Sequence, residues 1–226
     1  MKAIPIVLAS LLSALPIVAS DRGAEQERLQ KAESVVKAAL ESPDKGIPRE
    51  LLERAECVGV FPDVKKAAFI VGGQGGRGIF TCRDEDGELG APAFFKLAGG
   101  SVGWQFGGQE ADVVLLIMNR DGMKNLLQDK FAIGGEASAT AGPVGRDAKA
   151  ATDAQLQAQM LSWSRSQGLF LGASLSGSVI RPDAEANAKY YGKEVTANGI
   201  LVKHEVRVPR ESRPFVSLLN KIADRG

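Results

Sequence analysis

The sequence has little of what most enzymes need for catalysis. It contains one histidine, His204, and two cysteines in 226 residues. A single histidine cannot build the usual multi-histidine metal site, and the carboxylates are scattered without a pair whose spacing suggests acid–base chemistry. Aromatic residues make up only 6% of the chain, and no basic run accompanies them. We therefore expect a binding protein rather than an enzyme, with no metal, no cofactor and no nucleic-acid ligand.

Long apolar runs are also scarce, and the one near the N-terminus has the form of a secretion signal. Lys2 precedes an apolar stretch, interrupted by prolines, that ends in Val18-Ala19-Ser20 before Asp21. A membrane-spanning helix needs about 20 predominantly apolar residues, whereas a basic start, a short apolar segment and a small-x-small ending are typical of a cleaved signal peptide. The sequence predicts a signal peptide over residues 1–20, cleaved between Ser20 and Asp21 with Ala19 as the alternative. Export to the periplasm or the cell exterior follows.

N-terminal sequencing of the purified exported protein tests this prediction. We expect the mature chain to begin at Asp21, because cleavage follows the small residues that precede it. A protein that stays in the cytoplasm and begins at Met1 would contradict the prediction.

The chain has no excess of charge of either sign. Its 28 basic and 27 acidic residues become 27 of each once residues 1–20 are removed, because Lys2 is the only charged residue in that segment. A neutral domain has no global field that would draw it to nucleic acid or to an anionic membrane. Any such binding must come from a local group of charges.

Cys57 and Cys82 are the only cysteines, and an even pair in an oxidising compartment favours a disulfide. Two buried thiols are the alternative. If residues 57–61, 67–72 and 77–82 form a simple meander, the cysteines lie on non-neighbouring strands, at least about 9–10 Å apart. A disulfide allows a Cα separation of roughly 7 Å at most. The bond therefore requires the segment around Cys57 to lie against the 77–82 strand.

Apolar spacing and capping residues predict helices on both sides of a β-rich core. The expected helices cover residues 24–41, 48–55, 121–130 with Asp121 as the cap, 183–191 with Gly192 at its end, and 213–223. The core spans residues 57–180, including strands at 134–141 and 168–180, and one more strand is expected at 199–208. In the 168–180 segment, alternation predicts that Leu169 and Leu171 share the buried face.

Glycine recurs inside the expected strands. Gly73-x-Gly75-x-x-Gly78 matches a dinucleotide fingerprint in form, but a strand rather than a helix follows it, so we expect a hairpin. Glycine within strands marks bulges and close backbone approach. The sequence thus predicts one α+β domain over residues 21–226, with a mostly antiparallel, glycine-rich, curved sheet that can close toward a barrel and with flanking helices.

A small set of cations is the one candidate for a binding site. If the glycine-rich hairpin folds as expected, Lys65, Lys66 and Arg77 lie near one end of the sheet, with Lys96 on the next strand. Three cations can hold a phosphate or an anionic headgroup. Ordinary exposed charge is the alternative interpretation of each residue.

Several ordered motifs together resemble the SYLF domain family of lipid- and actin-binding domains. The stretches that carry the resemblance are Gly59-Val-Phe-Pro-Asp-Val-Lys-Lys-Ala-Ala-Phe-Ile-Val-Gly-Gly73, Gly99-Gly-Ser-Val-Gly-Trp-Gln-Phe-Gly107, Asp112-Val-Val-Leu-Leu-Ile-Met118, Ala141-Gly-Pro-Val-Gly-Arg146 and Ser164-Arg-Ser-Gln-Gly-Leu-Phe-Leu-Gly172. The likeness spans roughly residues 25–225, and the chain looks closest to the exported bacterial branch.

The resemblance implies binding of phosphoinositides or other anionic lipids, and actin binding in the fungal members. The predicted helix 24–41 is slightly acidic, whereas the eukaryotic members have a lysine-rich helix there. An exported protein also meets no actin in its own cell, so actin is not an expected partner. The expected function is binding of anionic lipid at a membrane or envelope surface. The alternative is an envelope domain for protein interaction or structure, without lipid binding.

Overall fold

The computed structural model describes residues 23–41, 46–68, 72–101, 107–134, 139–144 and 158–223. Six α-helices lie in these ranges: α1 (Gly23–Glu41), α2 (Arg49–Arg54), α3 (Arg120–Leu126), α5 (Ala184–Tyr191), α6 (Ala197–Leu201) and α7 (Arg213–Ala223), which the short 3-10 turn η2 (Arg210–Ser212) precedes. The strands are β1 (Cys57–Ala68), β2 (Gly72–Cys82), β3 (Ala93–Ser101), β4 (Gly107–Ile117), β5 (Phe131–Ala132), β6 (Ala139–Ala141), β7 (Met160–Ser166), β8 (Leu169–Gly172) and β9 (Ser178–Pro182).

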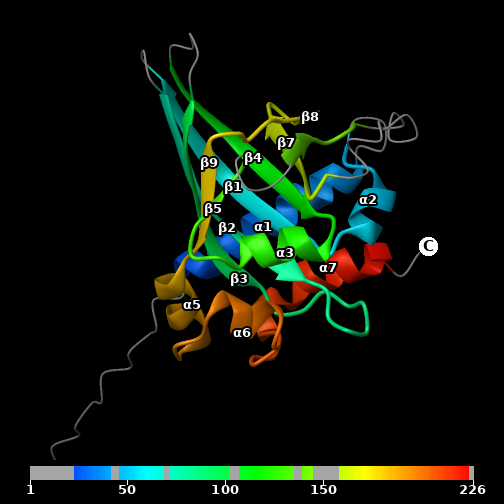
Figure 1. Ribbon diagram of the computed structural model, residues 1–226. Helices are drawn as coiled ribbons and strands as arrows, with labels where there is room; N and C mark the ends of the chain where they lie inside the picture. Colours follow the sequence, from blue (N-terminus) through cyan, green and yellow to red (C-terminus); the bar gives the residue numbers. More distant parts are fainter. Residues whose placement is uncertain are drawn as a thin grey trace, which may run out of the picture.

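The strands form one nine-stranded sheet in the order β5-β9-β3-β2-β1-β4-β7-β6, with β8 paired to β7. All pairs are antiparallel except the β6–β7 pair. The sheet curls into a half-barrel, and the helices pack around its lower part (Figure 1). The α+β class and the curved, mostly antiparallel sheet predicted from the sequence are confirmed.

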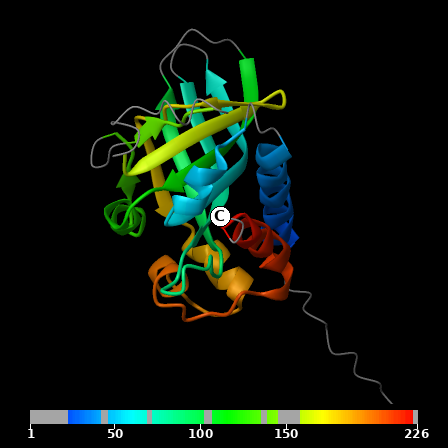
Figure 2. The same ribbon diagram turned by 90° about the vertical axis from the view of Figure 1, so that its right-hand side faces the viewer.

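Each face of the sheet buries its own set of apolar side chains. Val58, Ile79 and Phe94 point to the face covered by α1, α2 and α7, whereas Phe80 and Phe95 point to the other face, with α3 and α6. Figure 2 shows α1 and α7 on one flank of the sheet and α3 on the opposite flank. This alternation follows from the two-residue period of a strand, in which successive side chains leave on opposite faces.

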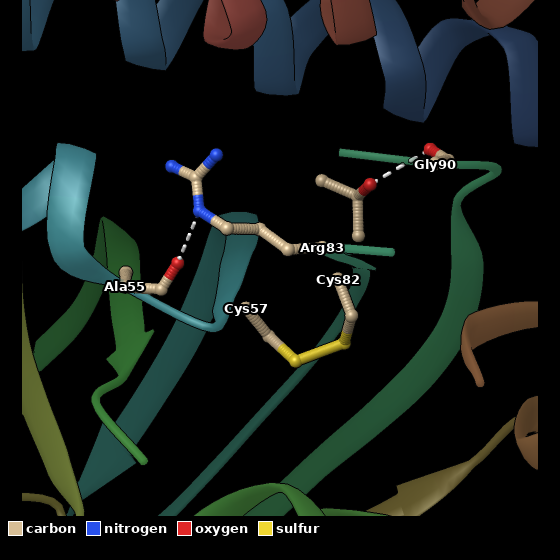
Figure 3. The surroundings of a disulfide bond; sticks show 6 residues. Ala55, Cys57, Cys82, Arg83 and Gly90 are labelled. Atoms are coloured by element: carbon tan, nitrogen blue, oxygen red, sulfur yellow. Dashed lines mark hydrogen bonds between the residues drawn. A yellow bond between two sulfur atoms is a disulfide. The ribbon is translucent and has the colours of Figure 1, made fainter. Parts of the chain in front are cut away.

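The first two strands form a single long hairpin rather than the expected meander of three. Cys57 lies directly opposite Cys82 in the β1–β2 register, with the Cα atoms 4.0 Å apart, and a disulfide joins them (Figure 3). The arrangement that the bond requires is therefore present. The meander was wrong because Pro62-Asp63, which resembles a turn, is absorbed as a bulge within β1 between Phe61 and Val64.

The residue after the disulfide holds the end of the hairpin to α2. The Arg83 guanidinium donates hydrogen bonds to the carbonyl oxygens of Leu52, Glu53 and Ala55, at 3.2, 3.0 and 2.9 Å. Figure 3 shows the bond to Ala55. These carbonyls belong to the last turn of α2 and its C-cap, which have no partner within the helix. The disulfide and Arg83 together tie α2 to the strand ends.

Glycines within the strands make room for aromatic rings. A Cβ atom at Gly59 would collide with the ring of Phe80, and one at Gly78 would collide with the ring of Phe61. Phe61 and Phe80 pack edge to face, with ring centroids 5.7 Å apart. Here glycine marks close approach across the sheet, as the sequence predicts.

The strand expected over residues 168–180 is two short strands, β8 and β9, and its predicted buried face is wrong. Leu169 and Leu171 are 50% and 65% exposed, whereas Phe170 between them is 2% exposed. Phe170 packs into the core beneath α1, and the Arg165 guanidinium lies 5.8 Å from its ring centroid. Burial of one large ring against that core outweighs burial of the two leucines on the opposite face.

Two other predictions need correction. Residues 199–208 contain no strand, because Thr196 caps the short helix α6 through a hydrogen bond from the Gly199 N–H. Helix α3 is capped by Asn119 rather than by Asp121. In the strand predicted at 134–141, residues 135–138 lie outside the described part of the chain. Residues 139–141 form β6.

The remaining helices lie close to their predicted positions. Helices α1, α5 and α7 match the segments 24–41, 183–191 and 213–223 within a residue, and Gly192 ends α5 in the left-handed conformation. None of the described helices combines the length and the apolar character needed to cross a bilayer.

Candidate functional site

The described residues do not assemble a common type of catalytic centre. Ser101 stands in a Gly-x-Ser-x-Gly pentapeptide, but it ends β3, and the next described element is a strand rather than the helix of a nucleophile elbow. His204 lies beside Gly90, near the other end of β3, so about 25–30 Å of strand separates it from Ser101. The described part of the chain also holds no group of three or more potential metal ligands.

The structure does not bring Lys65, Lys66 and Arg77 together as one group. Lys65 and Lys66 are consecutive in β1, so their side chains leave on opposite faces of the sheet. Lys65 lies on the face of α1, where its Nζ is 3.7 Å from Glu110 Oε1 on β4. Arg77 lies on that same face, but its cross-strand neighbour is a further cation, Lys96.

Three cations form a line across neighbouring strands on this face. Arg77 is directly opposite Lys96 in the β2–β3 register, and Lys96 is directly opposite Arg181 in the β3–β9 register. Directly opposed residues of antiparallel strands point to the same face, with Cβ atoms about 4.5–5.5 Å apart. We call these three residues the basic row. Like charges in this arrangement are destabilising, so the row requires a counter-charge.

Asp183 supplies that counter-charge from below the row. Its side chain is 2% exposed, and its Oδ1 lies 2.8 Å from Lys96 Nζ, while its Oδ2 lies 3.9 Å from Arg77 Nε. The same carboxylate accepts a hydrogen bond from the Ala186 N–H and so caps α5. The α5 N-terminus therefore fixes the charge that holds the row together.

Arg28 of α1 adds a fourth cation beside the row. Its guanidinium lies 5.5 Å from the centroid of the Phe94 ring, and its buried Nη1 has no hydrogen-bond acceptor among the described residues. Burial lowers the pKa of Arg28, the Glu25 carboxylate opposes that shift, and Arg77 adds to it. Two of the three row cations share the carboxylate of Asp183, whereas Arg28 also lies near Glu25 and Glu27, so the excess of positive charge lies along the row.

A second charged surface lies beside α1 where β1 bulges, next to the hollow that Arg28 and Arg77 share with Glu27 and Asp63. The bulge places Asp63 with a positive φ of 53°. Its carboxylate accepts a hydrogen bond from Lys31 Nζ at 2.7 Å, and its backbone N–H donates to Asp112 Oδ1 at 3.2 Å. Arg165 Nη1 lies 3.2 Å from the other oxygen of Asp112. These contacts connect α1, β1, β4 and β7.

These residues line a cleft of about 570 Å³, which we call the charged cleft. The charged side chains in its lining are Glu27, Lys31, Asp63, Glu110, Asp112 and Arg165. The hydrogen bond that Lys31 donates to the Asp63 carboxylate raises the pKa of Lys31. Burial raises the pKa of Asp112, although the Asp63 N–H and the Arg165 guanidinium oppose the shift. Four carboxylates face two cations in the lining, so the charged cleft has an excess of negative charge.

The sequence analysis identified Arg77 and Lys96 but missed Arg181, Asp183 and the charged cleft. Asp183 could have been found as the first residue of the helix predicted over 183–191, because aspartate is a preferred cap at the start of a helix. Arg181 could not, because its position opposite Lys96 depends on the β3–β9 register. Asp63 carries the Pro-Asp turn signal, and that signal was assigned to the end of a strand.

Comparisons with known proteins place the chain beside cytoskeletal regulators. A sequence profile of the Ysc84 family, described as "Las17-binding protein actin regulator", matches residues 98–222. LAS seventeen-binding protein 3 of Saccharomyces cerevisiae is 34% identical over 183 residues, which are 80% of this chain and 39% of that protein. The human SH3 domain-containing YSC84-like protein 1 is 28% identical over 184 residues, 81% of this chain and 53% of that protein.

The similarity covers only part of the length of these relatives. The chain spans about two fifths of the yeast relatives and about half of the human one. The description and the relatives' names are those of binding and regulatory proteins rather than enzymes. The family profile covers more than half of the chain, and the SYLF resemblance drawn from the motifs is confirmed: the chain belongs to the Ysc84 (SYLF) family.

Proposed function

We propose that this chain is a non-catalytic binding domain that holds anionic lipid headgroups at a membrane or envelope surface through its basic row. The observation that carries the proposal is the alignment of Arg77, Lys96 and Arg181 on three adjacent strands. A sheet that places like charges directly opposite one another loses stability, and an anion over the row recovers that loss. The family resemblance supplies the class of ligand.

In the basic row, Lys96 and Arg181 take the place of Lys65 and Lys66 from the cation set expected from the sequence. Lys65 lies beside Glu110 and close to the charged cleft, and Lys66 points to the other face of the sheet. Arg77 and Arg181 are exposed, and with strands about 4.8 Å apart they lie roughly 10 Å from each other. Each cation near an anionic surface contributes about 1 kcal/mol, so we expect weak, salt-sensitive attachment.

Pelleting with liposomes tests this proposal. The chain beginning at Asp21 is expected to pellet with vesicles that contain phosphatidylserine at about 0.1 M salt, and to be released at about 1 M, where the Debye length falls to about 3 Å. Removing two of the three row cations in the variant R77A/R181A is expected to abolish pelleting. The control K65A/K66A removes the same amount of charge outside the row and is expected to pellet like wild type. The proposal would be overturned if the control no longer pelleted, or if wild type did not pellet with these vesicles.

The proposal includes export of the chain. Export, as the leader pattern predicts, places the basic row where it faces an envelope membrane rather than the cytoplasm.

Binding of a protein partner is the second candidate function. The yeast relative is named for binding another protein, LAS seventeen, and a second charged surface lies beside α1. Failure of all liposome binding would leave protein binding as the function.

A further inference from the structure

The charged cleft lies between helix α1 and the sheet. Helix α1 borders it on one side, and the β1 bulge and strands β4 and β7 form its floor. A smaller hollow of about 190 Å³ shares Asp63, Glu110, Asp112 and Arg165 with it and continues to the β7–β8 turn at Gly168. The two hollows therefore form one groove that runs from α1 to the end of β7.

The exposed part of this groove is mostly charged. Val35 and Pro62 belong to its lining, but both are buried in the fold and leave little apolar surface. Glu27 and Glu110 stand at the rim, and each side chain is 64% exposed. A cationic side chain matches this arrangement, because its charged end reaches the carboxylates at the rim.

The existing cations leave part of the negative charge uncompensated. Lys31 is held between Glu27 and Asp63, at 2.9 and 2.7 Å, and Arg165 is held by Asp112. Lys65 approaches Glu110 only to 3.7 Å, beyond hydrogen-bond distance. The Glu110 carboxylate thus keeps acceptor capacity for a guanidinium or ammonium group that enters the groove.

We propose that the groove is a docking site for an arginine- or lysine-bearing segment of a partner protein. The partner's cation inserts between Glu27 and Glu110 and competes with Lys65 for the Glu110 carboxylate. None of the three row cations lines the groove itself, although Arg77 lines a neighbouring hollow with Glu27, Lys31 and Asp63. This inference stands independently of the lipid proposal.

Fluorescence anisotropy with a labelled hexa-arginine peptide tests the docking site, with a glycine-serine peptide of equal length as the blank. The variant E27Q/E110Q is expected to raise the dissociation constant about tenfold, because two exposed charge contacts are lost. The control E85Q/D86N removes the same charge from the exposed turn after β2 and is expected to leave the dissociation constant unchanged.

A pair of neighbouring lysines provides a test of opposite sign. K65A frees Glu110 and is expected to tighten hexa-arginine binding a few-fold, whereas K66A removes the same charge from the other face and is expected to leave it unchanged. Equal tightening by K65A and K66A would indicate net charge alone and would overturn the proposal. So would equal weakening by E27Q/E110Q and E85Q/D86N, or no hexa-arginine binding above the blank. The variant R181A removes a row cation that lines neither the groove nor the hollow beside it, and it is expected to bind the peptide like wild type, which separates this result from the liposome result.

Discussion

Replacing Cys57 and Cys82 with alanine is expected to lower the free energy of unfolding by at least about 3.5 kcal/mol. The disulfide closes a loop with a sequence separation of 25 residues, and losing that closure returns conformational entropy to the unfolded chain. Both side chains are fully buried, so the missing sulfur atoms also reduce packing. Urea unfolding of C57A/C82A and of the oxidised wild type measures the difference.

Wild type in reductant is the matched comparison, because it loses the loop closure but keeps the sulfur atoms. We expect its unfolding midpoint to fall between those of the oxidised wild type and the double variant. The reduced ends of β1 and β2 should stay paired through the backbone, since Cys57 remains opposite Cys82 in the register. Equal stability of oxidised and reduced protein would show that the bond does not form in solution or adds nothing.

Replacing Asp183 with alanine is expected to lower the free energy of unfolding by about 2–4 kcal/mol, because the change removes the charge-assisted contact to Lys96 and the counter-charge of the basic row. The Ala186 N–H at the start of α5 also loses its acceptor, which contributes about 1 kcal/mol of that loss. Thermal and urea unfolding of D183A measure the loss, and circular dichroism at low temperature checks that the fold is retained.

Two further variants separate the sources of this loss. D183N keeps an oxygen for the Ala186 N–H but removes the charge, so we expect it to recover only the capping part. E185A removes an exposed charge from the same helical turn and is expected to change stability by less than about 1 kcal/mol. If D183A were no less stable than E185A, the account of Asp183 as the counter-charge of the row would be wrong.

Local sequence patterns predicted the kinds of element but not how the strands pair. Helical spacing located α1 and α7, and glycine marked the strands where rings approach closely. The pairing of β1 was missed because Asp63 is held in the bulge by Lys31 and by Asp112, which are distant in sequence. The inverted burial of Leu169 and Leu171 has the same origin, since Phe170 belongs to a core cluster whose other members come from segments distant in sequence.

The candidate surfaces, too, could be predicted only in part from the sequence. That Lys65 and Lys66 point to opposite faces follows from the two-residue period of a strand and could have been read from the sequence. The neighbours that decide the roles of these cations could not be predicted from the sequence. Lys65 meets Glu110, and Arg77 meets Lys96, only because β1 pairs with β4 and β2 with β3 in particular registers. Charge patterns across a sheet depend on register, which single strands do not reveal.

The position of a bound anion tests the basic row most directly. Nuclear magnetic resonance of arginine Nε–Hε groups can follow a titration with short-chain phosphatidylserine below its critical micelle concentration. We predict that the signals of Arg77 and Arg181 shift together with one dissociation constant, and that the signal of Arg165 in the charged cleft stays in place. Shifts at Arg165 with none at Arg77 and Arg181 would contradict the assignment of anion binding to the row.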